Sequence, residues 1–102
     1  MASRRVEITT SGRGGTISYR EGRNLASFDW EFGGGDALVI LIGPKSEHWD
    51  LQNPWATGRQ AEIYEFVGAE VVRQQASGYS ADIDLENGFV TILKKIQEPG
   101  KV

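Results

Sequence analysis

The stretch SEHWDLQNPW, residues 46–55, contains the chain's only histidine and two of its three tryptophans. An imidazole acts as a general base when a carboxylate holds its far ring nitrogen and a reacting group meets the near one. Glu47 and Asp50 flank His48, but side chains so close in sequence rarely adopt that arrangement. We therefore predict that His48 is a binding or surface residue. A small hydrolase that uses His48 remains the second alternative.

The residue types and their spacing do not indicate a metal or cofactor site. Glu47, His48 and Asp50 do not have the spacing of a metal-binding motif. The chain has no cysteine, which excludes disulfides, cysteine-based zinc sites, iron–sulfur clusters and a thiol nucleophile. The sequence therefore predicts a protein that is not an enzyme, with no catalytic residue, no metal and no cofactor.

Trp49 and Trp55 come just before an amphipathic segment, and Pro54 stiffens the approach to it. One interpretation makes them a hydrophobic lid over the core. The other keeps at least one indole exposed as an interface anchor, because tryptophan is enriched among the residues that dominate protein–protein binding. We predict a binding surface here, formed by His48, Trp49, Asp50 and Trp55.

Two pairs of acids alternate with apolar residues: Asp29 and Glu31 in LASFDWEF, and Asp82 and Asp84 in SADID. Such a pair shares one face of a strand, with its members roughly 7 Å apart. That spacing could serve glycoside hydrolysis or a metal, but no cleft is indicated, and a solvated sheet face is the plainer interpretation. If the two strands are neighbours, the four acids and Glu86 form one acidic strip that could receive a basic protein partner.

The glycine clusters GRGG and GGGD lack the Lys-Ser/Thr of a phosphate loop and the order strand, GxGxxG, helix of a dinucleotide site. We interpret both as turns in which glycine supplies positive φ. Arginines at positions 4, 5, 13, 20 and 23 make the first quarter of the chain basic. The net charge of −3 nevertheless gives no general attraction to nucleic acid, so a nucleic-acid partner is not expected.

Hydrophobic periodicity predicts the elements. Alternation indicates strands over residues 4–10, 16–20, 25–32, 79–85 and 89–93, with residues 11–15 as a loop. The unbroken apolar run of residues 37–42 is typical of a strand covered on both sides. Residues 57–76 have helical spacing, with Thr57 and Gln60 as a capping box. Asn87-Gly88 is a strong turn signal and predicts a hairpin between the last two strands.

These elements predict an α+β fold of order ββββαββ, a curved antiparallel sheet of about six strands with one long helix packed on it. The 102 residues suit a single domain, residues 1–102. No stretch has the length and apolarity of a signal peptide or a membrane helix, so we expect a cytoplasmic protein without a membrane partner. The open sheet edges make a homodimer plausible.

The succession of HWDLQNPW, a helix with EIYEFV, and SGYSADID resembles the small immunity proteins of bacterial polymorphic toxin systems, in particular the immunity protein 74 family. The resemblance extends over residues 15–85. It implies a cytoplasmic protein that binds and neutralises a partner toxin without catalysis.

The order of four strands and a helix is also similar to that of the whirly and coactivator-type binders of single-stranded DNA. Such proteins hold the strand in a basic groove with stacking aromatic side chains. Phe28, Trp30 and Phe32 could serve this role, but Asp29 and Glu31 stand beside them. The sequence thus favours a protein-binding module, with a single-stranded nucleic-acid binder as the first alternative.

Overall fold

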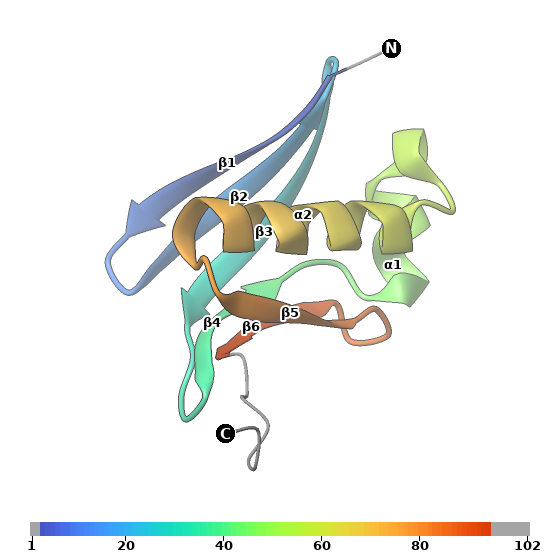
Figure 1. The fold of residues 1–102 in the computed structure, drawn as a ribbon. Coiled ribbons are helices and arrows are strands. Elements are labelled where there is room, and N and C mark those ends of the chain that lie inside the picture. The colour runs from blue at the N-terminus through green and yellow to red at the C-terminus, as the bar shows by residue number, and fades with distance from the viewer. Residues whose placement is uncertain (1–2, 95–102) are drawn as a thin grey trace.

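The computed structural model describes residues 3–94. In chain order the elements are β1 (Arg4–Ser11), β2 (Gly14–Glu21), β3 (Asn24–Phe32), β4 (Ala37–Ile42), α1 (Ser46–Gln52), the 3-10 turn η1 (Pro54–Ala56), α2 (Gln60–Gln75), β5 (Tyr79–Asp84) and β6 (Phe89–Lys94). The six strands form one open antiparallel sheet in the order β1-β2-β3-β4-β6-β5, and α2 lies across one face of it (Figure 1). The predicted α+β fold is confirmed. The short helix α1 was not predicted.

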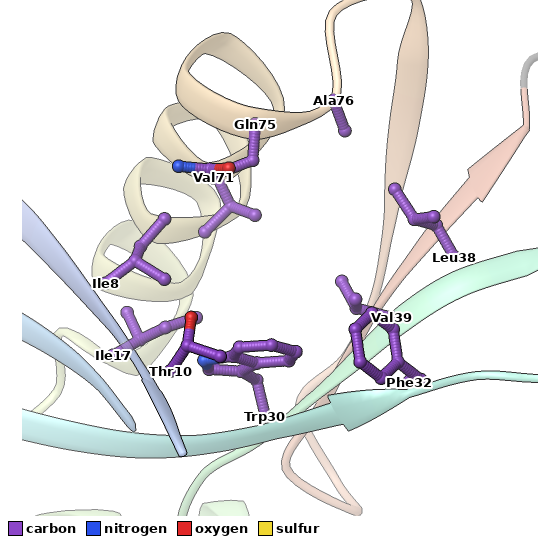
Figure 2. Close-up of a pocket in the computed structure, with 10 residues that line it drawn as sticks. All are labelled: Ile8, Thr10, Ile17, Trp30, Phe32, Leu38, Val39, Val71, Gln75 and Ala76. Carbon is purple, nitrogen blue, oxygen red and sulfur yellow. The ribbon is translucent and has the colours of Figure 1, made fainter. Parts of the chain in front are cut away.

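The sheet extends past the C-terminal end of α2. Helix α2 ends at Gln75, and the end of β3 and the turn into β4 lie beyond that end of the helix (Figure 1). Ten residues from α2, the segment after it and β1–β4 line a pocket at this end (Figure 2). Phe32 is 58% exposed there, so the elements within residues 3–94 leave the core partly open at this end.

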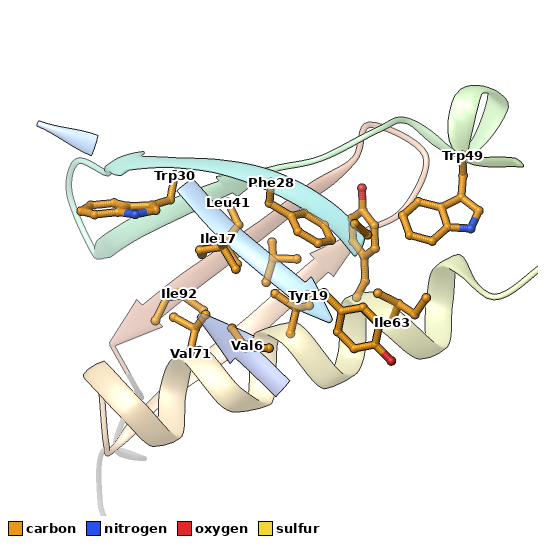
Figure 3. Close-up of a cluster of buried hydrophobic side chains, with 14 of the residues drawn as sticks. Val6, Ile17, Tyr19, Phe28, Trp30, Leu41, Trp49, Ile63, Val71 and Ile92 are labelled. Atoms are coloured by element: carbon orange, nitrogen blue, oxygen red, sulfur yellow. The ribbon is translucent and has the colours of Figure 1, made fainter. Parts of the chain in front are cut away.

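The core lies between α2 and the sheet face that it covers, which we call the inner face. Every second strand residue points into the core, and these side chains pack against the apolar side of α2. Trp49 of α1 closes one end (Figure 3). The largest fully buried side chains are Trp49, Tyr19, Tyr64, Phe28, Ile17, Leu41, Ile63, Ile92, Val67 and Val90.

The first hairpin is tighter than predicted. Only Gly12 and Arg13 lie outside β1 and β2, so the predicted loop over residues 11–15 is too long. Gly12 has a φ of +62° and fits the expected role in a turn. Gly15, by contrast, is a strand residue. It is needed because of space: a Cβ at this position would lie 1.9 Å from the Thr9 carbonyl oxygen.

The predicted capping box is wrong. Helix α2 begins at Gln60, three residues later than expected, and no side chain caps it. The Thr57 hydroxyl instead donates to the carbonyl of Pro54. The Gln60 amide donates to the carbonyls of Pro44 and Leu85 at 3.2 and 3.0 Å, which joins the start of α2 to two loops.

The second hairpin loop, by contrast, is one residue longer than the predicted strand ends imply. Strand β5 ends at Asp84 and β6 begins at Phe89, so four residues form the loop and Asn87-Gly88 are its last two. Gly88 has a φ of +81°, and its N–H donates to the Asp84 carbonyl at 2.9 Å. The predicted turn at Asn87-Gly88 is therefore confirmed.

Candidate functional site

We call the face of the sheet turned away from α2 the outer face. Acidic and apolar side chains form an ordered pattern on it. Paired residues on neighbouring strands project from the same face. Asp29 on β3 pairs with Ile42 on β4, Ile42 pairs with Phe89 on β6, and Phe89 pairs with Asp84 on β5. One continuous row across four strands thus has an acid at each end and apolar side chains between.

A second row beside the first also has an acid at each end, with one apolar and one hydroxyl side chain between them. Glu31 pairs with Ile40, Ile40 with Thr91, and Thr91 with Asp82. We call the outward apolar residues of the two central strands the apolar stripe; they are Ile40, Ile42, Phe89 and Leu93. The stripe remains accessible, since Phe89 is 40% exposed and the other three are half-buried.

The four acids are exposed, and they form two flanks rather than the single strip expected from the sequence. Strands β3 and β5 are not neighbours, because β4 and β6 lie between them. Three inter-strand steps place Asp29 and Asp84 roughly 14 Å apart. We call Asp29 and Glu31, with Asp82 and Asp84, the acidic flanks. Glu86 lies in the β5–β6 loop, outside both rows.

Asp84 has an additional structural role. Its carboxylate accepts hydrogen bonds from the Asn87 side-chain amide at 2.8 Å and from the Asn87 backbone N–H at 3.2 Å. These bonds favour the ionised form, so the pKa of Asp84 lies below its ordinary value. This flank therefore holds a fixed negative charge.

The remaining part of the outer face, on β1 and β2, is polar and internally paired. Arg20 donates to Glu7 at 2.7 Å, and Arg5 lies 3.8 Å from the same carboxylate. The Arg20 hydrogen bond lowers the pKa of Glu7. The two arginines thus share one carboxylate, which offsets half of their positive charge.

His48 lies on α1, whereas the acidic flanks lie on β3 and β5. Its side chain is about half exposed, and Nε2 lies 3.4 Å from the Glu47 carboxylate. Asp50 serves the loop instead: its carboxylate accepts from the Gly58 N–H at 3.0 Å. The structure therefore does not bring Asp50 and His48 together as a base and its orienting acid.

The two tryptophans of this segment differ in environment. Trp49 is 1% exposed, and its indole N–H donates to the Ala56 carbonyl at 2.9 Å. It is a core residue with no exposed indole for a partner. Trp55 is half-buried, with its ring stacked on Tyr19 at a centroid distance of 6.3 Å. Only Trp55 retains surface that could contact a partner.

The aromatic side chains suggested for nucleic-acid stacking point to the wrong side for that purpose. Phe28 and Trp30 are 2% and 9% exposed and belong to the core on the inner face. Trp30 also donates its indole N–H to the Thr9 carbonyl at 2.9 Å. Phe32 alone is exposed, at the end of β3.

Residues 3–94 contain no group of three or more histidine, cysteine or acidic side chains placed to hold a metal ion. Within the same range, no helix is both long and apolar enough to cross a bilayer. Comparison with family models, with curated proteins and with solved structures gives no match for this chain.

The apolar stripe is the part of this surface that sequence reasoning missed. The signal was present in ALVILI, which is apolar at every position. We expected such a strand to be covered on both sides, which is wrong. Leu41 is fully buried on the inner face, whereas Ile40 and Ile42 project from the outer face and are only half-buried. Accessible apolar side chains that group in one patch are typical of a surface that receives a partner.

Proposed function

We propose that this protein is a non-enzymatic binding module and that its outer face docks another protein. The observation that supports this proposal is the doubled row in which outward apolar residues of β4 and β6 lie between carboxylates of β3 and β5. Interfaces commonly have an apolar centre that excludes water and a polar rim. The apolar stripe and the acidic flanks fit these two parts.

The arrangement also specifies the partner's chemistry. Burial of the apolar stripe requires a complementary apolar ridge, because only the apolar area removed from water adds hydrophobic free energy. Lysines or arginines on either side of that ridge, roughly 14 Å apart, would meet the two acidic flanks. Such rim charges accelerate encounter and select the partner more than they add affinity.

A second copy of this chain does not fit the same surface. A two-fold interface places the same patch on both subunits, so the acidic flanks of one copy would face those of the other. Like charges brought together in this way oppose association. A homodimer, if it forms, would use another surface, such as the open edge of β1 or β5.

The resemblance to immunity proteins is consistent with this proposal. A protein that neutralises a toxin needs a specific docking surface and no catalytic group of its own, and such a partner toxin would be basic where it meets the acidic flanks. We propose the toxin-neutralising role in a bacterial cytoplasm as the specific form of this binding function.

Site-specific photocrosslinking tests the docking surface. The photoreactive amino acid p-benzoylphenylalanine replaces Phe89, the exposed centre of the apolar stripe, in cells that express the chain. As a matched control it replaces Ala69, which is exposed on α2 on the opposite side of the molecule. Irradiation, capture and mass spectrometry then identify any adduct.

The proposal predicts an adduct from position 89 with a protein whose crosslinked surface carries basic residues, and none from position 69. An adduct that forms equally from both positions would show that association is not specific to the outer face. Absence of any adduct from position 89 would contradict the proposal.

A further inference from the structure

The pocket at the C-terminal end of α2 is separate from the outer face. It encloses about 370 Å³ on the inner side of the sheet, at the lower end of the volume range in which proteins bind small molecules. Val71, Gln75 and Ala76 contribute from α2 and the residue after it, and the other walls come from β1–β4 (Figure 2). Its origin is the overhang of the sheet beyond the last turn of the helix.

The walls are apolar and partly aromatic. Trp30 and Phe32 meet edge to face, with ring centroids 5.4 Å apart and an interplanar angle of 90°. The hydrogen bond from Trp30 to the Thr9 carbonyl holds the indole in place. Ile8 and Val39 stand on opposite sides of the opening (Figure 2). A flat ring could therefore contact both aromatic side chains and aliphatic walls.

The polar groups of the pocket are few and uncharged. None of its ten lining residues is ionisable. Thr10 supplies a hydroxyl and Gln75 a carboxamide, both exposed and without a hydrogen-bond partner among the described residues. An ion would lose its hydration here without gaining a counter-charge, which is costly. A neutral hydrogen-bonding group at the rim would not incur that cost.

We propose that this pocket binds a small, uncharged, ring-containing apolar ligand whose polar group reaches Thr10 and Gln75. Trp30 and Phe32 contact the ring, and the aliphatic side chains enclose it. This site lies on the inner side of the sheet, so its failure would leave the proposed docking function of the outer face intact.

Fluorescence titration of the full chain with N-phenyl-1-naphthylamine, a neutral two-ring probe, tests the proposal. The probe is expected to bind saturably with one site per chain, whereas the anionic relative 1-anilinonaphthalene-8-sulfonate binds much more weakly. No saturable binding of the neutral probe would overturn the proposal. Equal binding of both probes would overturn the uncharged class of ligand.

Two substitutions fill the pocket from different elements: Thr10→Trp from β1 and Gln75→Trp from α2. The matched control for the first is Thr9→Trp, because Thr9 is the preceding residue on the same strand and points to the outer face. Each filled variant is expected to reduce the affinity for the neutral probe at least about tenfold, by occupying the space required by the ring. The Thr9 variant should bind as the wild type does.

Circular dichroism and thermal melting establish that each variant is folded. The proposal is contradicted if folded Thr10→Trp and Gln75→Trp bind the neutral probe as tightly as the Thr9→Trp control does.

Discussion

Single residues in this chain derive their roles from neighbours that are distant in sequence. Trp49 and Trp55 are six positions apart, yet one is buried in the core and the other stacks at the surface on Tyr19. The sequence could not predict which of the two is buried, because both precede the same helix. Their difference in exposure depends on the position of β2, whose Tyr19 contacts Trp55. Pattern reasoning placed them next to the core and could not determine their exposure.

Gly15 is an example in which a small residue serves packing. Its missing side chain leaves room for the Trp30 indole, which crosses β2 to reach the Thr9 carbonyl. A Cβ would lie 2.7 Å from Trp30 Nε1 in addition to the clash with the Thr9 oxygen. The chain must therefore shift locally to admit any larger residue at this position.

We predict that Gly15→Ala lowers the free energy of unfolding by about 1–3 kcal/mol, the usual range for overpacking. Urea denaturation measures this change. The matched control is Gly34→Ala, since a Cβ at Gly34 would meet nothing within 4 Å and its φ is not positive. Equal urea midpoints of unfolding for Gly15→Ala and Gly34→Ala would refute the packing role of Gly15.

At the scale of elements, a cluster of charges joins the β1–β2 edge to the start of α2. The Arg59 side chain donates to Glu21 and to Glu62, both at 2.7 Å. Arg4 reaches Glu62 at 2.7 Å, and Tyr19 donates to Glu21 at 2.6 Å. These hydrogen bonds, from Arg59 first and then Tyr19, lower the pKa of Glu21 to about 2. The helix is thus anchored electrostatically where no side chain caps it.

The acid dependence of stability follows from the sign of this shift. The folded pKa of Glu21 is below its ordinary value of 4.5, so the folded state binds the proton less readily than the unfolded chain. The stability contributed by Glu21 is fully present above about pH 4.5. It is lost as the pH falls from 4.5 toward 2.

We predict that Glu21→Gln lowers the free energy of unfolding at pH 6 by about 1–2 kcal/mol, since water partly screens a pair at the surface. The variant should also lose less stability than the wild type between pH 6 and pH 3. Urea titrations at both pH values measure this. The control Glu65→Gln removes a carboxylate with no ion-pair partner within residues 3–94. This variant should keep the wild-type dependence on pH. An unchanged pH dependence in Glu21→Gln would contradict the prediction.

The elements themselves were largely predictable, and their arrangement was not. Alternation in LASFDWEF and helical spacing in EIYEFVGAEV are local signals, so β3 and α2 could be predicted from sequence. The pairing of β4 with β6 joins residues about fifty positions apart, and no local pattern encodes it. The sequence placed the acids of β3 and β5 on strands, whereas their separation into two flanks with a stripe between them depends on the strand order.

At the scale of the whole molecule, the two faces of one sheet differ in burial and composition. The inner face forms the core with α2, with a pocket at one end. The outer face presents the apolar stripe between the acidic flanks. A substitution on the outer face should therefore alter binding while leaving the fold intact, which allows the proposed function to be tested without loss of structure.

The most direct measurement is a calorimetric titration of the protein crosslinked from position 89 against a triple variant, Asp29→Asn, Glu31→Gln and Asp82→Asn. A control with the same net charge is Asp36→Asn, Glu47→Gln and Glu65→Gln, all outside the acidic flanks. At about 0.5 kcal/mol per exposed ion pair, the account predicts roughly tenfold weaker binding by the flank variant than by the control. Wild-type affinity should also fall as salt rises. Equal affinities for the two variants, unaffected by salt, would contradict the account.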